Sequence, residues 1–179
     1  KLKHWQHMIN GLARDGDYKE ILDLYYEMDN IGILPDVNIA NNVLNAFLVL
    51  GYRDKGSRFI KQMAERGIDL DIVTYNTLLK SMVKDDIYRA KSMFDRIIRK
   101  EYRDLQADKY TYSIMVHGLK INGLLSEAVD LFWAMLENNI SFDIYILNDV
   151  LHCLILRNEI EEAEKIFHRF INNITVKMI

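Results

Sequence analysis

The chain has 179 residues, half of them hydrophobic, and its 23 lysines and arginines against 26 aspartates and glutamates give a formal net charge of −3 at pH 7. This balance excludes a protein that holds nucleic acid mainly through a strongly basic surface. The single cysteine, Cys153, excludes an internal disulfide and lies in the apolar run DVLHCLIL, where we expect a buried free thiol.

Four similar segments follow one another along the chain, each built around an aspartate. They are PDVNIANNVL (35–44), LDIVTYNTLL (70–79), ADKYTYSIMV (107–116) and FDIYILNDVL (142–151), and their aspartates are 35, 37 and 35 residues apart. The N-terminal KLKHWQHMIN fits the same register, with Lys1 in the place of the aspartate. The spacing predicts repeats at 1–35, 36–70, 71–107, 108–142 and 143–179.

Each repeat is predicted to contain two helices. The first follows the aspartate, and the second carries, in chain order, YKEILDLYYEM, SRFIKQMAERG, YRAKSMFDRII, SEAVDLFWAML and EEAEKIFHRF. Apolar residues recur three and four apart in these segments, which is typical of helices buried on one face. In the last two repeats the expected core residues are Ala128, Leu131, Phe132 and Met135, then Ile160, Ala163, Ile166, Phe167 and Phe170. Because one hairpin cannot bury its apolar face alone, the period predicts an all-α solenoid with a concave groove.

A polar residue occupies the same place in the first helix of every repeat. We call these residues the polar column: Gln6, Asn41, Asn76, Ser113 and Asn148. In the third repeat Asn76, Lys80 and Lys84 are four apart, on a face that we expect to look outward. Because Asn is a weak helix former, its recurrence indicates a site. Isolated surface polarity is the alternative.

The aspartates have a simpler explanation as well. We call them the aspartate column: Asp36, Asp71, Asp108 and Asp143. Asp is a preferred helix N-cap, and its charge suits the positive end of the helix dipole. The sequence leaves open whether this column only caps helices or also takes part in a site.

The residues resemble one family, the pentatricopeptide repeat proteins. The resemblance rests on VTYNTLLKSM (73–82), SEAVDLFWAM (126–135) and IGILPD (31–36), and it extends to all five repeats, although only the second begins with the usual Pro-Asp. No Trp-x-x-Leu-Gly-x-x-Tyr signature of tetratricopeptide repeats is found. The resemblance implies a right-handed α-solenoid of about five helix-turn-helix repeats, and we expect it to be a piece of a longer array.

Single-stranded RNA is the partner that this resemblance implies, bound in mitochondria or plastids with one base per repeat. In the family, each base is read by a residue of the first helix together with the last residue before the next repeat. The corresponding pairs here are Gln6 with Asp36, Asn41 with Asp71, Asn76 with Asp108 and Ser113 with Asp143, whereas Asn148 has no assigned partner. In the family, Asn with Asp favours U and Ser with Asp favours G, so the expected sequence is 5′-x-U-U-G-x-3′.

Two further columns are implied by the same resemblance. Each base is expected to stack on the side chain two residues after the aspartate, which is Val73, Tyr110 or Tyr145 in the last three repeats. Phosphates are expected to contact basic residues near the ends of the first helices: Arg14, Lys80, Lys84 and Lys120. Four such contacts would give a salt slope of roughly −3.

Other functions receive less support from the sequence. His4 and His7 are three apart, but no nearby Cys or carboxylate completes a metal site. With no nucleophile motif, phosphate loop or cofactor motif, we expect no enzyme and no cofactor. No apolar run is long enough to span a membrane. The alternative function is a protein-binding scaffold within an organellar ribonucleoprotein, for example a ribosome component or assembly factor. Because the family mostly acts in organelles, we expect a mitochondrial protein, with the plastid as the alternative.

Overall fold

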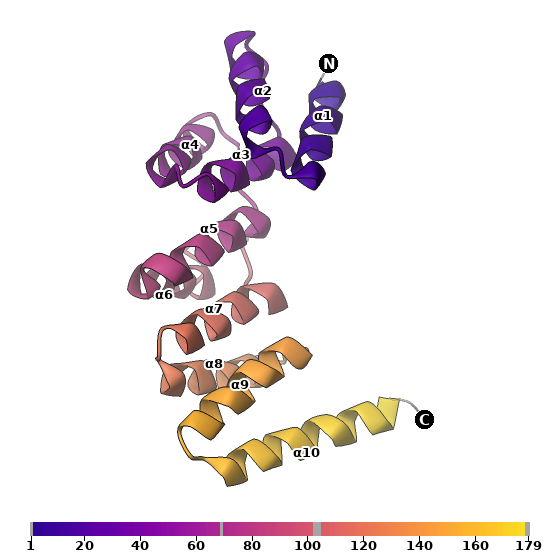
Figure 1. Ribbon diagram of the computed structural model, residues 1–179, viewed down its shortest axis with the longest axis vertical. Coiled ribbons are helices and arrows are strands. Elements are labelled where there is room, and N and C mark those ends of the chain that lie inside the picture. Colours follow the sequence, from indigo (N-terminus) through magenta and orange to yellow (C-terminus); the bar gives the residue numbers. More distant parts are fainter. Residues whose placement is uncertain (1, 69, 102–104, 178–179) are drawn as a thin grey trace. The chain divides into compact units, whose positions relative to one another are not determined.

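The computed structural model describes residues 2–68, 70–101 and 105–177, with side chains up to residue 170. Over these residues the chain forms ten α-helices and no strand (Figure 1). In order they are α1 (Leu2–Asp15), α2 (Tyr18–Asn30), α3 (Val37–Val49), α4 (Arg53–Glu65), α5 (Ile72–Asp85), α6 (Ile87–Ile98), α7 (Lys109–Ile121), α8 (Leu125–Glu137), α9 (Ile144–Leu156) and α10 (Ile160–Lys177). None of these helices is both long and apolar enough to cross a membrane.

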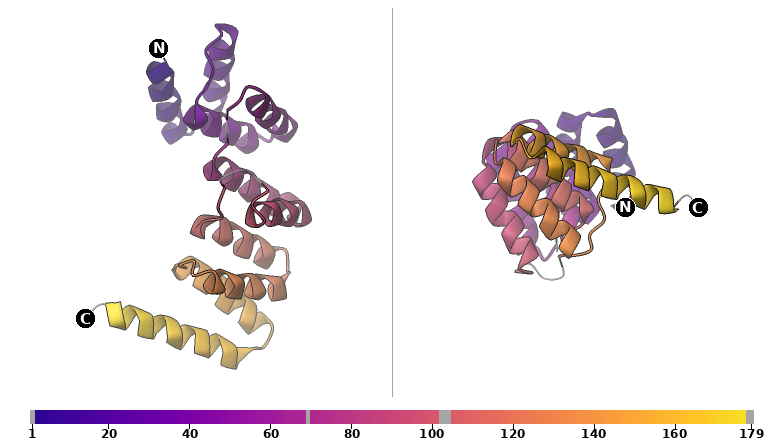
Figure 2. Two further views of the ribbon diagram at one scale, coloured as in Figure 1. Left: turned by 180° about the vertical axis from the view of Figure 1, so that it is seen from behind. Right: turned by 90° about the horizontal axis from the view of Figure 1, so that it is seen from below.

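The chain divides into two compact units, and the division falls inside α5, between Leu78 and Leu79. In the first unit α1 packs on both α2 and α3, and α3 packs on both α2 and α4. The second unit repeats this arrangement, since α7 packs on α8 and α9, and α9 packs on α8 and α10 (Figures 1 and 2). Within each unit, therefore, the first helices of successive hairpins lie side by side, which places their polar residues next to one another.

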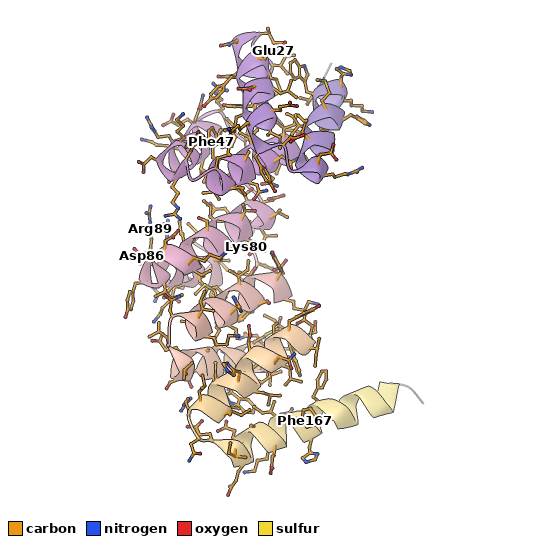
Figure 3. The ribbon with its side chains drawn as sticks, viewed as in Figure 1. Glu27, Phe47, Lys80, Asp86, Arg89 and Phe167 are labelled. Atoms are coloured by element: carbon orange, nitrogen blue, oxygen red, sulfur yellow. The ribbon has the colours of Figure 1, made fainter. Side chains whose placement is uncertain are left out.

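The hydrophobic core follows the predicted stripes, with exceptions in the last helix. Ala128, Phe132 and Met135 of α8 are fully buried, and Leu131 is half-buried. In α10 the prediction is right for Ala163 and Ile166 but wrong for Ile160 and Phe167, which are 46% and 45% exposed (Phe167 is labelled in Figure 3). Helix α10 packs mainly on α9, so only part of its apolar face is covered. Cys153 is buried, as predicted, and burial raises the pKa of its thiol.

Residues with positive φ end most of the helices. Gly67 (φ 73°) follows α4, whereas Lys100 (φ 57°) occupies the corresponding place after α6, with its backbone N–H donating to Ile97 O at 3.0 Å. An L-residue with a Cβ is strained in this left-handed region, and glycine is not. The third repeat therefore ends its second helix with a residue that this conformation disfavours.

Replacing Lys100 by glycine is expected to raise the free energy of unfolding by about 0.5–1 kcal/mol, because glycine relieves the left-handed strain at this exposed site. Chemical denaturation of the Lys100→Gly variant measures the change. Gly67→Ala, at the corresponding position, is the control and should lower stability by a similar amount. A stability loss in Lys100→Gly would contradict the prediction.

Candidate nucleic-acid interface

Each residue of the aspartate column lies just before a first helix (α3, α5, α7 or α9) and caps its N-terminus, as the capping explanation predicts. In each case one carboxylate oxygen accepts from a backbone N–H two or three residues later in the chain. The pairs are Asp36 with Ile39 N (2.9 Å), Asp71 with Thr74 N (2.9 Å), Asp108 with Thr111 N (2.8 Å), and Asp143 with Tyr145 N (3.1 Å) and Ile146 N (3.2 Å). These bonds satisfy donors that the first helical turn leaves without partners.

In the first unit the same carboxylates also bind the polar column. Gln6 Nε2 donates to Asp36 Oδ2 at 2.6 Å, while Asp36 Oδ1 caps α3. Asn41 Nδ2 lies 3.2 Å and 3.4 Å from the two carboxylate oxygens of Asp71. Each aspartate thus joins the first helix of one repeat to the start of the next. Capping and pairing are compatible functions of one carboxylate, because its two oxygens can accept several hydrogen bonds.

A third residue fixes the orientation of the Asn41 amide. The hydroxyl of Thr74 lies within hydrogen-bond distance of both Asn41 Oδ1 and Asp71 Oδ1, and Thr74 is buried. The amide therefore presents its NH₂ group to a carboxylate and its oxygen to a hydroxyl. Thr74 was not predicted as a site residue, because a threonine early in a helix gives no signal by itself.

The third pair, Asn76 with Asp108, has one member in each unit. Asn76 is only 3% exposed, and Thr74 and Leu78 on the same helix are 1% and 5% exposed. The prediction that this face looks outward is therefore wrong for Asn76 but right for Lys80 and Lys84, which are exposed. The spacing of four correctly places Asn76, Lys80 and Lys84 along one side of α5, but spacing cannot tell which part of that side is covered.

The last two repeats differ from the first two. Within the described part of the chain, Ser113 forms no hydrogen bond with Asp143. Instead Asp143 Oδ2 lies 3.4 Å from Lys109 Nζ, while its Oδ1 caps α9. Ser113 is half-buried and Asn148 is exposed. The sequence pattern pairs Ser113 with Asp143, but in the described residues no direct hydrogen bond joins the two side chains.

The three residues of the predicted stacking column are exposed apolar or aromatic side chains. Val73 is 54% exposed, Tyr110 51% and Tyr145 76%, and each stands at the second position of its first helix, α5, α7 or α9. Their recurrence at one helix position is informative, because single exposed hydrophobic residues are common on protein surfaces. Aromatic and apolar faces exposed in register can accept stacked bases.

The four predicted phosphate contacts do not have equal environments. Arg14, Lys80 and Lys84 are exposed, and they form no ion pair with any carboxylate in the described residues (Lys80 is labelled in Figure 3). The Lys120 side chain is only 20% exposed, and its ammonium is paired with Asp149 Oδ1. Asp149 Oδ2 also lies 2.9 Å from His117 Nδ1. Three cations of this column are therefore available to an outside anion, and the fourth is neutralised within the protein.

Comparison with known proteins identifies the repeat. The family model described as PPR repeat matches residues 3–33 and 110–140, and that described as PPR repeat family matches residues 35–84. The chain belongs to the pentatricopeptide repeat family. A chloroplastic pentatricopeptide repeat-containing protein of Arabidopsis thaliana is 30% identical over 148 residues, and a mitochondrial one from the same plant is 28% identical over 152 residues. The alignments cover 82% of this chain in both cases, but only 27% and 18% of those relatives, so the chain spans about a quarter of their length or less.

Solved structures of the family share the fold. PPR10 of maize, crystallised with an 18-nucleotide psaJ RNA element, matches 97% of this chain with a TM-score of 0.76 at 20% identity, over 25% of its own length. The PPR domain of Arabidopsis thaliana protein-only RNase P 1, crystallised with tRNA, matches 97% of this chain and 90% of that domain with a TM-score of 0.77 at 18% identity. The predicted all-α solenoid of pentatricopeptide repeats is thus confirmed.

Proposed function

We propose that this chain is a sequence-specific single-stranded RNA-binding segment of an organellar protein, with one base bound per repeat. The observation that carries the proposal is the pairing of Gln6 with Asp36 and of Asn41 with Asp71 across successive repeats. An amide held by a carboxylate has a fixed set of donors and acceptors, which is what recognition of the edge of an unstacked base requires. RNA in the crystals of PPR10 and of the RNase P domain supports the same partner class.

The base sequence proposed for the target is 5′-x-U-U-G-x-3′, from Asn41, Asn76 and Ser113 with Asp71, Asp108 and Asp143. Reading of the second U by Asn76 requires that this side chain, which is 3% exposed, become accessible to the base. The exposed Val73, Tyr110 and Tyr145 support stacking of the bases beside these residues. Arg14, Lys80 and Lys84 supply exposed positive charge for phosphates. Relatives named as chloroplastic and as mitochondrial support an organellar location, and we propose the mitochondrion with the plastid as the alternative.

A protein-binding scaffold within an organellar ribonucleoprotein is the second candidate. Two observations favour it: the net charge of −3 and the neutralisation of Lys120 by Asp149. Both reduce the electrostatic attraction between the chain and RNA. A scaffold would keep the Asp–amide bonds only as structural links between repeats, and so would show no dependence on base identity.

The Asn41→Ser variant is expected to change the preferred base at its repeat from U to G, since the family pairs Ser with Asp for G. Titration of short RNAs containing UUG, GUG and a scrambled sequence, at two salt concentrations, measures the preference of wild type and variant. An exposed control, Asn138→Ser just after the second helix α8, should keep the wild-type preference. Equal binding of all three RNAs by the wild type would overturn the proposal in favour of the scaffold.

A further inference from the structure

The contacts of Asp149 recur at one other place in the fold. Asp149 directly follows Asn148 of the polar column, and it contacts His117, which is four residues after Ser113. In the first unit Asn42 directly follows Asn41, and its Nδ2 donates at 2.8 Å to Oδ1 of Asn10, four residues after Gln6. In these two repeats, therefore, the residue after the polar-column member reaches the first helix of the preceding repeat. This position has no assigned function in the proposed reading of RNA.

Asp149 is the charged residue at that position, and it faces two possible donors to phosphate. Its side chain is 19% exposed, and it holds His117 through Oδ2 and Lys120 through Oδ1. Lys120 is 20% exposed, so its ammonium has exchanged part of its water for this carboxylate. A phosphate approaching Lys120 would have to break that ion pair, or bind against electrostatic repulsion from the nearby carboxylate of Asp149.

The third repeat, which contains Lys80, provides an internal comparison with the fourth, which contains His117 and Lys120. Lys80 stands four residues after Asn76, as His117 stands four residues after Ser113, and Lys80 is exposed. The residue equivalent to Asp149 is Ile114, which is apolar and 7% exposed and so offers no charge. The two repeats thus differ: the side chains of His117 and Lys120 contact the carboxylate of Asp149, whereas the residue at the equivalent position for Lys80 is the uncharged Ile114.

We propose that Asp149 determines how strongly this part of the chain binds phosphate, by holding Lys120 and His117 away from the RNA backbone. The inference rests on the RNA-binding function proposed above and adds a residue to it. Asp149 is a positioning residue, since it acts through the cations that it holds. Because Asp149 cancels one of the four predicted phosphate contacts, the affinity of the chain for RNA depends more on base identity than on the charge of the RNA backbone.

The Asp149→Asn variant tests the inference. Asn keeps the size and a hydrogen-bond acceptor but removes the charge, so one phosphate contact through Lys120 becomes available. Binding of a UUG-containing RNA should then tighten about five-fold near 0.1 M salt, and the salt slope should steepen by about 0.7. The titrations are done between about 50 and 200 mM salt. Circular dichroism confirms that the variant is folded.

Two further variants separate this effect from a general change of net charge. Asp130→Asn removes the same charge from an exposed site on α8 and should tighten binding less than two-fold, since distant charges are screened by salt. In a Lys120→Met background, Asp149→Asn should have no more effect than Asp130→Asn. If Asp149→Asn and Asp130→Asn behave alike in the wild-type background, the inference fails while RNA binding stands. If the wild type binds no RNA, the proposed function fails, and the inference is overturned with it.

Discussion

Replacing Gly118 by alanine is expected to lower the free energy of unfolding by about 2 kcal/mol, although alanine is the better helix former. A Cβ at Gly118 on α7 would lie 2.6 Å from Cβ and Cγ1 of Val83, far inside van der Waals contact. Val83 is 3% exposed, and its Cβ is bonded directly to the backbone of α5, so it cannot move unless that backbone moves as well. Overpacking of this kind typically costs about 1–3 kcal/mol, and we expect the upper end, partly offset by roughly 1 kcal/mol of helix propensity.

Gly11 supplies a matched control for this prediction. It stands five residues after Gln6, as Gly118 stands five residues after Ser113, and both are inside first helices. A Cβ at Gly11 would meet no atom within 4 Å, so Gly11→Ala should raise stability by about 0.5–1 kcal/mol. Denaturant titration of the two variants should therefore give changes of opposite sign. Stabilisation of both would show that α5 and α7 can separate without loss of packing.

The close approach at Gly118 also explains a neighbouring contact. Asn122, just after α7, donates through Nδ2 to Val83 O at 2.7 Å and to Gly118 O at 2.8 Å. This side chain satisfies carbonyl oxygens near the end of a helix, where intrahelical partners are missing. Because the bond depends on the short distance between the two helices, we expect Gly118→Ala to weaken it and to add to the measured loss.

The fold could be predicted from the sequence because its signal is repeated. The spacing of the aspartates at 36, 71, 108 and 143 and the apolar stripes in the second helices both indicate stacked hairpins, and the observed helices follow them. The predictions of burial are wrong where the exposure of a helix face depends on which other helices pack against it. Phe167 has the same periodicity as Ile166 but stays exposed, because periodicity defines a stripe and not how much of the stripe another helix covers.

The candidate site could be predicted less completely, for a related reason. The pairs Gln6–Asp36 and Asn41–Asp71 belong to columns, so recurrence indicated them. Asp149 belongs to no column, since the equivalent residues are His7, Asn42, Thr77 and Ile114. Its contacts with His117 and Lys120 depend on three-dimensional packing. The position of Lys120 in the sequence, one residue from that of Arg14 and Lys84 in their repeats, therefore gave no indication that a carboxylate already held it.

The largest expected effect on recognition comes from Asp71, whose carboxylate both caps α5 and holds Asn41. Asp71→Ala should lower the free energy of unfolding by about 1–2 kcal/mol, since a lost N-cap typically costs that much. Asp71→Asn should change stability by less than about 0.5 kcal/mol, because Asn caps helices as well as Asp does. The two variants thus separate the two functions of one side chain.

Recognition should respond differently from stability. Hydrogen bonds to charged groups contribute about 1.5–3 kcal/mol, more than bonds between neutral groups, so Asp71→Asn loosens the hold on Asn41 even though it keeps the cap. We therefore expect Asp71→Asn to reduce the preference for U over other bases at that repeat about ten-fold, while its denaturation curve stays close to that of the wild type. RNA titrations with each base at that position, together with denaturation curves, measure both quantities.

Asp86 is the control that removes a cap without touching the aspartate column. It caps the second helix α6 by accepting from Arg89 N at 3.0 Å (both residues are labelled in Figure 3). Asp86→Ala should lower stability by about 0.5–2 kcal/mol and leave base preference unchanged. If Asp71→Asn likewise left base preference unchanged, the aspartate column would be explained by capping alone. A loss of preference in Asp71→Asn, with none in Asp86→Ala, would assign Asp71 to base recognition, because both aspartates cap a helix but Asp71 also holds the amide of Asn41.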